Sequence, residues 1–278
     1  MLSYQHSYHA GCFADVIKHF VLTRLFTYMT QKDKPLLYLD THSGRGLYDL
    51  QDAHALKTNE AEFGIRPVWN GQQALPIELE PYLHAIRAVN TEGELRRYPG
   101  SPALAIDFLR AQDRLVFCER HDREFQHLTH LSRRKKRVTL LHDDGLVALN
   151  ALVPPIERRG LIFIDPAYEV KTEYRDIAQA VKKAHQRFAT GVYCIWYPIL
   201  SDTTHLKQLF NGLKSMTNAN HLQVTFESAV DAGMSGCGLW IINPPYLLAR
   251  DIEPGLKAFT RLFNPGVSRY RIDTPLSS

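Results

Sequence analysis

The segment at residues 160–168, with the sequence GLIFIDPAY, constrains this chain more than any other. Its four consecutive apolar residues predict a short strand that is buried on both faces, as in a parallel sheet. The strand ends at Asp165-Pro166-Ala167-Tyr168. Open α/β sheets bind ligands just outside the carboxyl ends of their strands, so we expect this tetrapeptide at the mouth of a site. An ordinary Asp-Pro turn is the structural alternative.

The tetrapeptide resembles the Asp/Asn-Pro-Pro-Tyr/Phe loop of methyltransferases that modify exocyclic amino nitrogens, with Ala167 in place of the second proline. The adenine amino lone pair is delocalised into the ring, so this nitrogen is a poor nucleophile. The Asp165 carboxylate and the Pro166 carbonyl can each accept one N–H bond and aim the lone pair at a methyl group. The Tyr168 ring can stack on a base that has left its helix. We therefore predict Asp165, Pro166 and Tyr168 as catalytic residues, with Tyr168 also binding the substrate.

A second buried strand is predicted at residues 35–39, and it leads into the sequence DTHSGRG at residues 40–46. A strand, an acid and a Gly-x-Gly turn are typical of a nucleotide site in a Rossmann-like sheet, because Gly44 and Gly46 let the backbone approach a ligand closely. Position 49 is Asp, so the dinucleotide fingerprint is incomplete. This favours S-adenosylmethionine over NAD as the cofactor.

The acid that would bind ribose hydroxyls is Glu119, which ends the strand at residues 114–118. Because it comes so late in the chain, we expect residues 49–97 to be an inserted helical subdomain of a methyltransferase domain formed by residues 1–48 and 98–278. Ser101 is predicted as a helix N-cap, with Pro102 at the first helical position. Asp144, followed by Gly145, comes after the strand at residues 138–141, where an acid commonly accepts from the cofactor adenine.

The predicted fold class is α/β, with seven strands that match the Rossmann-like sheet of S-adenosylmethionine-dependent methyltransferases. The seventh strand, at residues 239–242, runs into Asn243-Pro244-Pro245-Tyr246. By its letters alone this is the better catalytic tetrapeptide. Chain order favours Asp165, because the catalytic loop should follow the fourth strand, whereas Asn243 follows the seventh and is expected at the far side of the sheet.

The amino-terminal part combines a polar segment at residues 3–13 with a predicted helix at residues 14–30. The polar segment is either a flexible tail or a segment that folds over a bound substrate, with Tyr4 available to stack. Apolar residues recur along the helix at spacings of three and four, and Asp15 favours its start. Lys18 and His19 fall outside the most apolar stripe, a position typical of solvated side chains.

The chain has a net charge of +4, which permits a nucleic-acid partner without demanding one. Five consecutive cations at residues 133–137 indicate either phosphate contacts or a solvated loop. The four cysteines are scattered without a Cys-x-x-Cys motif, so no metal site is predicted and reduced thiols in a cytoplasmic protein are expected. Neither a signal peptide nor a membrane span is predicted, so no membrane partner is expected.

Taken together, the chain resembles the RlmJ-type 23S rRNA adenine-N6 methyltransferase family almost from end to end. The likeness runs through MLSYQH at residues 1–6, HAG at 9–11, DKP at 33–35, YLDTH at 38–42, YPGSP at 98–102, RRGL at 158–161, RFATG at 187–191, WYP at 196–198 and INPP at 242–245. The resemblance implies that the second Asn-Pro-Pro element is structural. It also implies cofactor contacts at Lys18, His19, His42, Ser101, Glu119, Asp144, Gly145 and Asp165.

The resemblance further implies an rRNA contact at Tyr4, and we include His6 of the same segment as a substrate-binding residue. The expected function is methylation of adenine N6 in 23S rRNA by S-adenosylmethionine, without a metal or an obligate protein partner. Two alternatives use the same features. One is a DNA adenine-N6 methyltransferase, and the other is a non-catalytic RNA-binding protein that keeps the fold.

Overall fold

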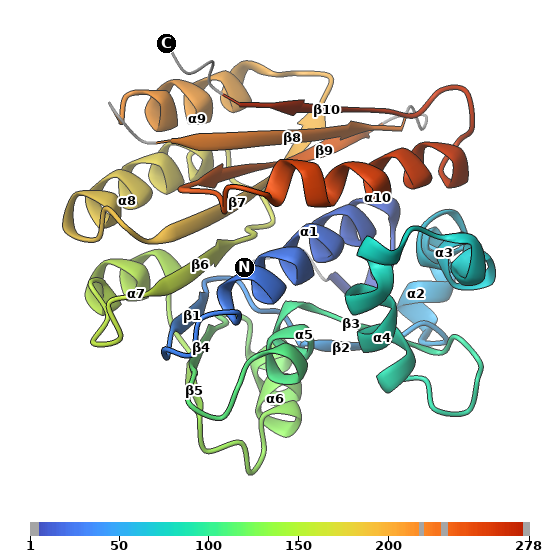
Figure 1. Ribbon diagram of the computed structural model, residues 1–278, viewed down its shortest axis with the longest axis horizontal. Helices are drawn as coiled ribbons and strands as arrows, with labels where there is room; N and C mark the ends of the chain where they lie inside the picture. Colours follow the sequence, from blue (N-terminus) through green and yellow to red (C-terminus); the bar gives the residue numbers. More distant parts are fainter. Residues whose placement is uncertain (1–5, 217–219, 229–232, 275–278) are drawn as a thin grey trace.

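A mixed eight-stranded sheet forms the centre of the computed structural model, which describes residues 6–216, 220–228 and 233–274 (Figure 1). The strand order is β10-β8-β9-β7-β6-β1-β4-β5. Strands β7, β6, β1, β4 and β5 pair in parallel, and β9, β8 and β10 continue the sheet in antiparallel fashion. The strands are β1 (Leu37–Asp40), β4 (Arg114–Cys118), β5 (Val138–Leu141), β6 (Gly160–Ile164), β7 (Val192–Leu200), β8 (His221–Glu227), β9 (Met234–Ile242) and β10 (Arg269–Asp273).

Helices cover both faces of the sheet, because successive side chains of each buried strand point to opposite sides. Leu161 and Phe163 of β6 belong to one apolar cluster, whereas Ile162 and Ile164 belong to the other. The first cluster includes side chains of α1 (Phe13–Met29), α5 (Ser101–Phe108), α6 (Asp122–Leu131) and α10 (Leu248–Leu262). The second includes side chains of α7 (Gly145–Leu152), α8 (Glu173–Arg187) and α9 (Thr204–Lys214).

The predicted α/β class is confirmed, and all seven predicted strands are present. The count of seven is wrong by one, because β10 pairs with β8 at the edge of the sheet. This strand was missed because its sequence, RYRID, is mostly polar and lacks the apolar run of a buried strand. The strand that leads into Asn243, β9, is not an edge strand: it lies inside the sheet between β7 and β8.

The segment between the short paired strands β2 (Leu47–Asp49) and β3 (Arg97–Pro99) is mainly helical. Its side chains Ile65, Val68 and Tyr82 share the apolar cluster of α1 and α10. Its division from the rest of the chain as a subdomain stays a prediction. The segment contains α2 (Ala53–Thr58), η2 (Glu60–Phe63), α3 (Ile65–Gly71), η3 (Gln72–Ala74), η4 (Ile77–Leu79) and α4 (Glu80–Ala88), while η1 (His6–Tyr8) precedes α1.

Helix α1 is buried on almost every side, since it lies between the sheet and the helices α4, α5 and α10. The expectation that Lys18 and His19 are solvated is therefore wrong: their exposed fractions are 3% and 2%. Their stripe is less apolar than the rest of the helix, yet it faces the interior. No helix in the described residues combines the length and the apolar character needed to cross a membrane.

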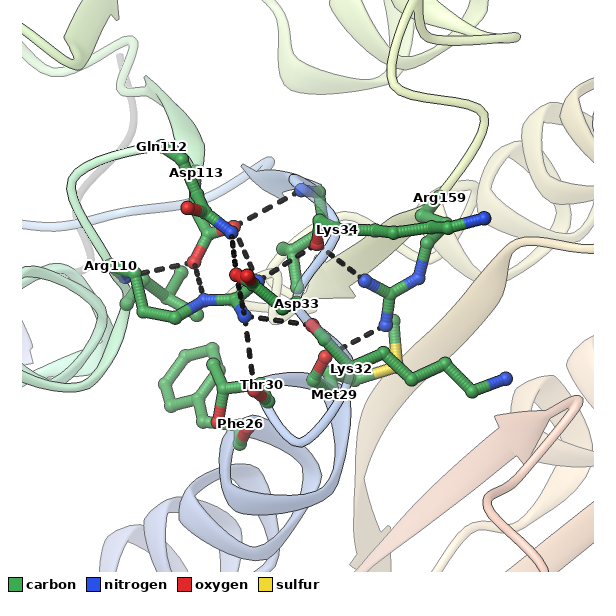
Figure 2. A network of polar contacts seen from close by, with 12 residues as sticks. Phe26, Met29, Thr30, Lys32, Asp33, Lys34, Arg110, Gln112, Asp113 and Arg159 are labelled. Carbon is green, nitrogen blue, oxygen red and sulfur yellow. Dashed lines mark hydrogen bonds and ion pairs between the residues drawn. The ribbon is translucent and has the colours of Figure 1, made fainter.

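Two arginines hold the chain at the point where α1 ends (Figure 2). Arg110 donates to the carbonyls of Thr30, Lys32 and Lys34 at 2.7–3.0 Å and also pairs with the buried Asp113. Arg159 donates to the carbonyls of Met29 and Lys34 at 2.8 and 2.6 Å. Cations are favourable at a helix carboxyl terminus, where carbonyls lack intrahelical partners. These bonds fix the position of α1 relative to β1, β4 and β6.

We expect Arg110→Ala to lower the free energy of unfolding by about 2–3 kcal/mol, because it leaves several carbonyls and the buried Asp113 without their charged donor. Chemical denaturation with circular dichroism measures this change. Arg133→Ala is the matched control, since the Arg133 side chain is exposed and makes no bond within the described residues. A loss below about 0.5 kcal/mol is expected for the control, and an equal loss in both variants would contradict the role of Arg110.

Candidate active site

A cavity of about 860 Å³ lies beyond the carboxyl ends of β1, β4, β5 and β6. In the strand order, the chain leaves β1 toward β4 on one side and later returns to β6 on the other. This is a topological switch point, where open α/β sheets bind ligands. The volume suits a nucleotide-sized molecule. The predicted site residues that line the cavity are His6, Lys18, His19, His42, Gly44, Ser101, Glu119, Asp144, Asp165 and Pro166.

The glycine turn after β1 is tied to the acid that ends β4. Gly44 has a φ of 60°, and a Cβ there would lie 2.5 Å from the Tyr48 hydroxyl. Its N–H donates to Glu119 Oε2 at 2.8 Å, and the N–H of His121 donates to Oε1 at 2.6 Å. Burial raises the pKa of Glu119, although both N–H bonds oppose the rise. These two bonds use two of the roughly four acceptor positions of the Glu119 carboxylate, and the others remain for ligand hydroxyls.

The second predicted glycine of the turn has a different environment. Gly46 has a φ of 79°, and a Cβ there would lie 2.4 Å from Leu131 of α6. Its carbonyl accepts a bond from the N–H of Gly100 at 2.9 Å. Gly46 is not among the residues that line the cavity. The structure therefore gives it a packing position between the turn and two helices, and a direct cofactor contact stays a prediction.

Asp144 and Gly145 begin helix α7 at the cavity. Asp144 Oδ1 caps the helix by accepting from the N–H groups of Leu146 and Val147 at 2.8 and 3.3 Å, and Oδ2 lies 3.3 Å from Arg120. A Cβ on Gly145 would lie only 1.9 Å from the Thr41 carbonyl oxygen. Gly145 is buried beneath the cavity wall, so it brings α7 against the β1 loop and places Asp144 at the cavity.

Two further predicted residues come from the loop after β1 and the start of α5. Burial lowers the pKa of His42 to about 4, so its ring is neutral at physiological pH. The predicted N-cap is off by one residue: Gly100 occupies the cap and Ser101 begins the helix. The Ser101 hydroxyl bonds instead to the carboxyl of Asp40, a fully buried residue. Burial raises the pKa of Asp40 to about 7, with the charge of Asp165 adding to the rise.

Asp165 begins the loop after β6 and faces helix α1. Its Oδ2 accepts from Lys18 Nζ at 2.6 Å, across 147 residues of sequence. Within the described residues, its Oδ1 accepts no hydrogen bond, and neither does the Pro166 carbonyl. Both residues line the cavity. A held carboxylate therefore presents one open acceptor beside a second open acceptor of the backbone.

Lys18 is shared with a second carboxylate, Asp15, for which the sequence predicted only a position at the start of the helix. Asp15, 1% exposed, has its Oδ1 at 2.8 Å from Lys18 Nζ, and its Oδ2 accepts from Gly11 N–H and lies 2.9 Å from His6 Nε2. Burial alone would raise the pKa of Asp15, but His6 and Lys18 lower it well below its ordinary value. The i, i+3 spacing of Asp15 and Lys18 was the signal that could have revealed this pair.

The other residues of the predicted site differ in their position. His19 bonds through Nδ1 to the hydroxyl of Tyr98 at 2.8 Å, and burial together with the Lys18 charge lowers its pKa well below the ordinary value, so its ring is neutral. Tyr168 has a φ of 53°, is 9% exposed, and donates its hydroxyl to the Trp196 carbonyl. Its ring packs in the apolar cluster and does not line the cavity, so its stacking role stays a prediction.

The predicted RNA contact at Tyr4 lies outside the described residues.

The second tetrapeptide lies at the opposite edge of the sheet. Asn243 follows β9, which runs antiparallel to β7. Its side-chain amide donates to the carbonyls of Ala189 and Gly191, just before β7 begins, at 2.7 and 2.8 Å. The Asn243 amide therefore joins two chain segments far from the cavity. Among the described residues, no cluster of three or more His, Cys, Asp or Glu side chains could hold a metal ion.

Comparisons with known proteins show which family the chain resembles over its length. Residues 33–270 match the family model "RsmJ: Ribosomal RNA large subunit methyltransferase D, RlmJ". The chain is 40% identical to a protein of Escherichia coli (strain K12) over 91% of each chain, and 39% identical to one of Haemophilus influenzae over 95% of each; both are named ribosomal RNA large subunit methyltransferase J. A crystal structure of a Legionella pneumophila protein, 47% identical, superposes with a TM-score of 0.91 and covers 97% of this chain and 99% of its own.

We expect Asp15→Asn to lower the free energy of unfolding at pH 7 by about 2–4 kcal/mol, because it removes one charge from a buried ion-pair network. A carboxylate with a lowered pKa in the folded state adds stability above its ordinary value of 3.8, and that stability is lost as the pH falls through the folded-state pKa. Denaturation between pH 7 and pH 3 should therefore show the difference in stability between the two proteins beginning to shrink as the pH falls below about 4. A difference that stays constant over this range would contradict the pairing.

Proposed function

This chain belongs to the RlmJ family of ribosomal RNA large subunit methyltransferases, and from this premise we propose that it methylates adenine N6 in 23S rRNA with S-adenosylmethionine. The observation that supports this most is the pair of open acceptors at Asp165 Oδ1 and the Pro166 carbonyl. They lie at the wall of a nucleotide-sized cavity, and Lys18 holds the other oxygen of the carboxylate.

The cavity fits S-adenosylmethionine by its volume and by the chemistry of its donors and acceptors. Glu119 would accept from the ribose hydroxyls with the acceptor positions that Gly44 and His121 leave open. Asp144 would accept from the adenine amino group, and the turn at Gly44 would admit the methionine part. When bound, S-adenosylmethionine supplies an electrophilic methyl group on a sulfonium sulfur. We place Lys18, His19, His42, Ser101 and Gly145 around it as the remaining binding residues.

The chain's own residues would then orient the target amine. Asp165 Oδ1 and the Pro166 carbonyl would each accept one N6 hydrogen, which draws the nitrogen toward tetrahedral geometry and directs its lone pair away from the adenine ring. Lys18 keeps the carboxylate from rotating, because it holds Oδ2 while Asp15 holds Lys18. Asp165 would accept the proton that the amine releases late in the reaction. His6, beside Asp15 at the cavity, and Tyr4 would contact the RNA.

We expect Asp165→Ala to lower kcat on unmodified 23S rRNA by about 10²–10³-fold or more, because it removes an acceptor aimed at the reacting nitrogen. Transfer of a tritiated methyl group measures the rate, with duplex DNA offered in parallel as the alternative substrate. Asn243→Ala is the matched control from the other tetrapeptide. It should lose about 1–2 kcal/mol of stability with kcat within about twofold of the wild type. Near-normal methylation by the Asp165 variant would overturn the proposal.

We expect Gly145→Ala to abolish S-adenosylmethionine binding in calorimetric titration, because the new Cβ cannot lie 1.9 Å from the Thr41 carbonyl and α7 must shift with Asp144. Gly71→Ala is the control, since a Cβ there meets only Leu262, at 4.0 Å. The control should bind the cofactor as the wild type does. Unchanged binding by the Gly145 variant would exclude this edge of the cavity as the cofactor site.

A further inference from the structure

Four loops that are far apart in sequence lie at the end of the sheet opposite the cavity, where the parallel strands β1, β4, β5 and β6 begin. The parallel register places Leu37 of β1 beside Arg114 of β4 and Gly160 of β6, and Leu115 beside Val138 of β5. The residues that lead into these strands therefore lie at one edge. We call residues 31–36, 109–114, 132–137 and 154–159 the basic edge.

The basic edge carries a large excess of positive over negative charge. It contains eleven Lys and Arg residues against three Asp and Glu residues, a net charge of +8, whereas the whole chain carries +4. The remaining residues therefore have a net charge of −4. Such a separation of charge marks a surface that attracts polyanions. The cations are Lys32, Lys34, Arg110, Arg114, Arg133, Arg134, Lys135, Lys136, Arg137, Arg158 and Arg159.

Some of these cations hold the loops together. Arg137 donates to the carbonyls of Ile106, Leu109 and Arg110, and so joins the loop before β5 to the end of α5. Arg110 and Arg159 hold the loop before β1, as Figure 2 shows. The basic run at residues 133–137 is thus not uniform, because its last member is a structural residue and only the first four remain for another role.

The other cations point outward. In Figure 2 the side chains of Lys32 and Lys34 extend away from the network that holds their backbone. Within the described residues, no hydrogen bond or ion pair involves the side chains of the outward set, all of which are exposed. The acids of this edge do not neutralise the set: Asp113 pairs with Arg110, Glu157 pairs with Arg114, and Asp33 lies 3.9 Å from Arg110. The outward set is Lys32, Lys34, Arg133, Arg134, Lys135, Lys136 and Arg158.

We propose that the basic edge binds the phosphate backbone of the rRNA at a distance from the target adenine, an inference that rests on the proposed function. Cations presented by fixed loops release counterions from RNA without a large ordering cost. The edge and the cavity are separated by the length of the parallel strands, about 15 Å or more at ~3.3 Å per residue. A short target loop cannot reach both, so the edge contacts only a larger folded RNA.

The test compares two RNAs with a variant in which Arg133, Arg134, Lys135 and Lys136 are all changed to Gln while Arg137 is kept. We expect KM for unmodified 23S rRNA to rise about tenfold or more, and the salt dependence of its binding to weaken by about three in log–log slope. The kcat should stay unchanged, as should KM for a short transcript that contains the adenine methylated by the wild type. The matched control changes Lys182, Lys207, Lys214 and Lys257, four exposed lysines of α8, α9 and α10, to Gln and should leave all values unchanged.

An unchanged KM and salt slope for 23S rRNA would overturn the inference and leave the edge to another polyanion, such as an acidic protein surface. Equal losses on both RNAs, or equal losses in the control, would overturn it as well. Thermal unfolding of each variant verifies that the fold is kept. If the wild type methylates no RNA, the proposed function fails, and the salt dependence of 23S rRNA binding still decides whether the basic edge is an RNA surface.

Discussion

Lys18 lies between two carboxylates in the interior, and the arrangement of the site depends on this ion pair. Its ammonium is 2.8 Å from Asp15 and 2.6 Å from Asp165. One ammonium cannot neutralise two carboxylates, so Asp15 also takes His6 and the Gly11 N–H as partners. Buried charges are tolerated only when they are paired and hydrogen-bonded. The network thereby joins the amino-terminal segment, helix α1 and the loop after β6.

Helix α1 is fixed at both ends by charged groups. Asp15 and Lys18 connect its first turns to the site, and Arg110 and Arg159 bind the carbonyls where it ends. Apolar packing against the sheet buries most of the surface of α1. Such packing tolerates small shifts of the helix, whereas hydrogen bonds are directional and do not. The distance from Lys18 to Asp165 is therefore set by contacts at the opposite edge of the sheet as well as by its own neighbours.

The sequence predicted those parts of the fold and of the candidate site for which a residue pattern has a single physical cause. Short apolar runs located the buried strands, and chain order separated Asp165 from Asn243. Elements rich in polar residues were harder to predict from the sequence. Strand β10 was missed because its RYRID sequence has no apolar run. The periodicity of α1 suggested solvated positions for Lys18 and His19, whereas the helix is enclosed on almost every side. Asp15 was not recognised, since an acid in the first turn of a helix is common for reasons of helix capping alone.

Some features depend on tertiary contacts that no local pattern reports. Arg137 stands in a run of five cations, yet it alone turns inward to three carbonyls. Tyr168 is the residue type expected for a stacking ring, but its hydroxyl donates to the Trp196 carbonyl and its ring packs in the apolar core. Ser101 differs from its predicted capping position by a single residue, which is enough to direct its hydroxyl to Asp40.

The separation of +8 at one edge from −4 over the rest gives the molecule a large permanent dipole moment. In the field of a polyanion such a molecule is oriented before contact, with its basic edge toward the nearest phosphates. The charge layout therefore gives the approach to any polyanion a preferred orientation, before any base is read.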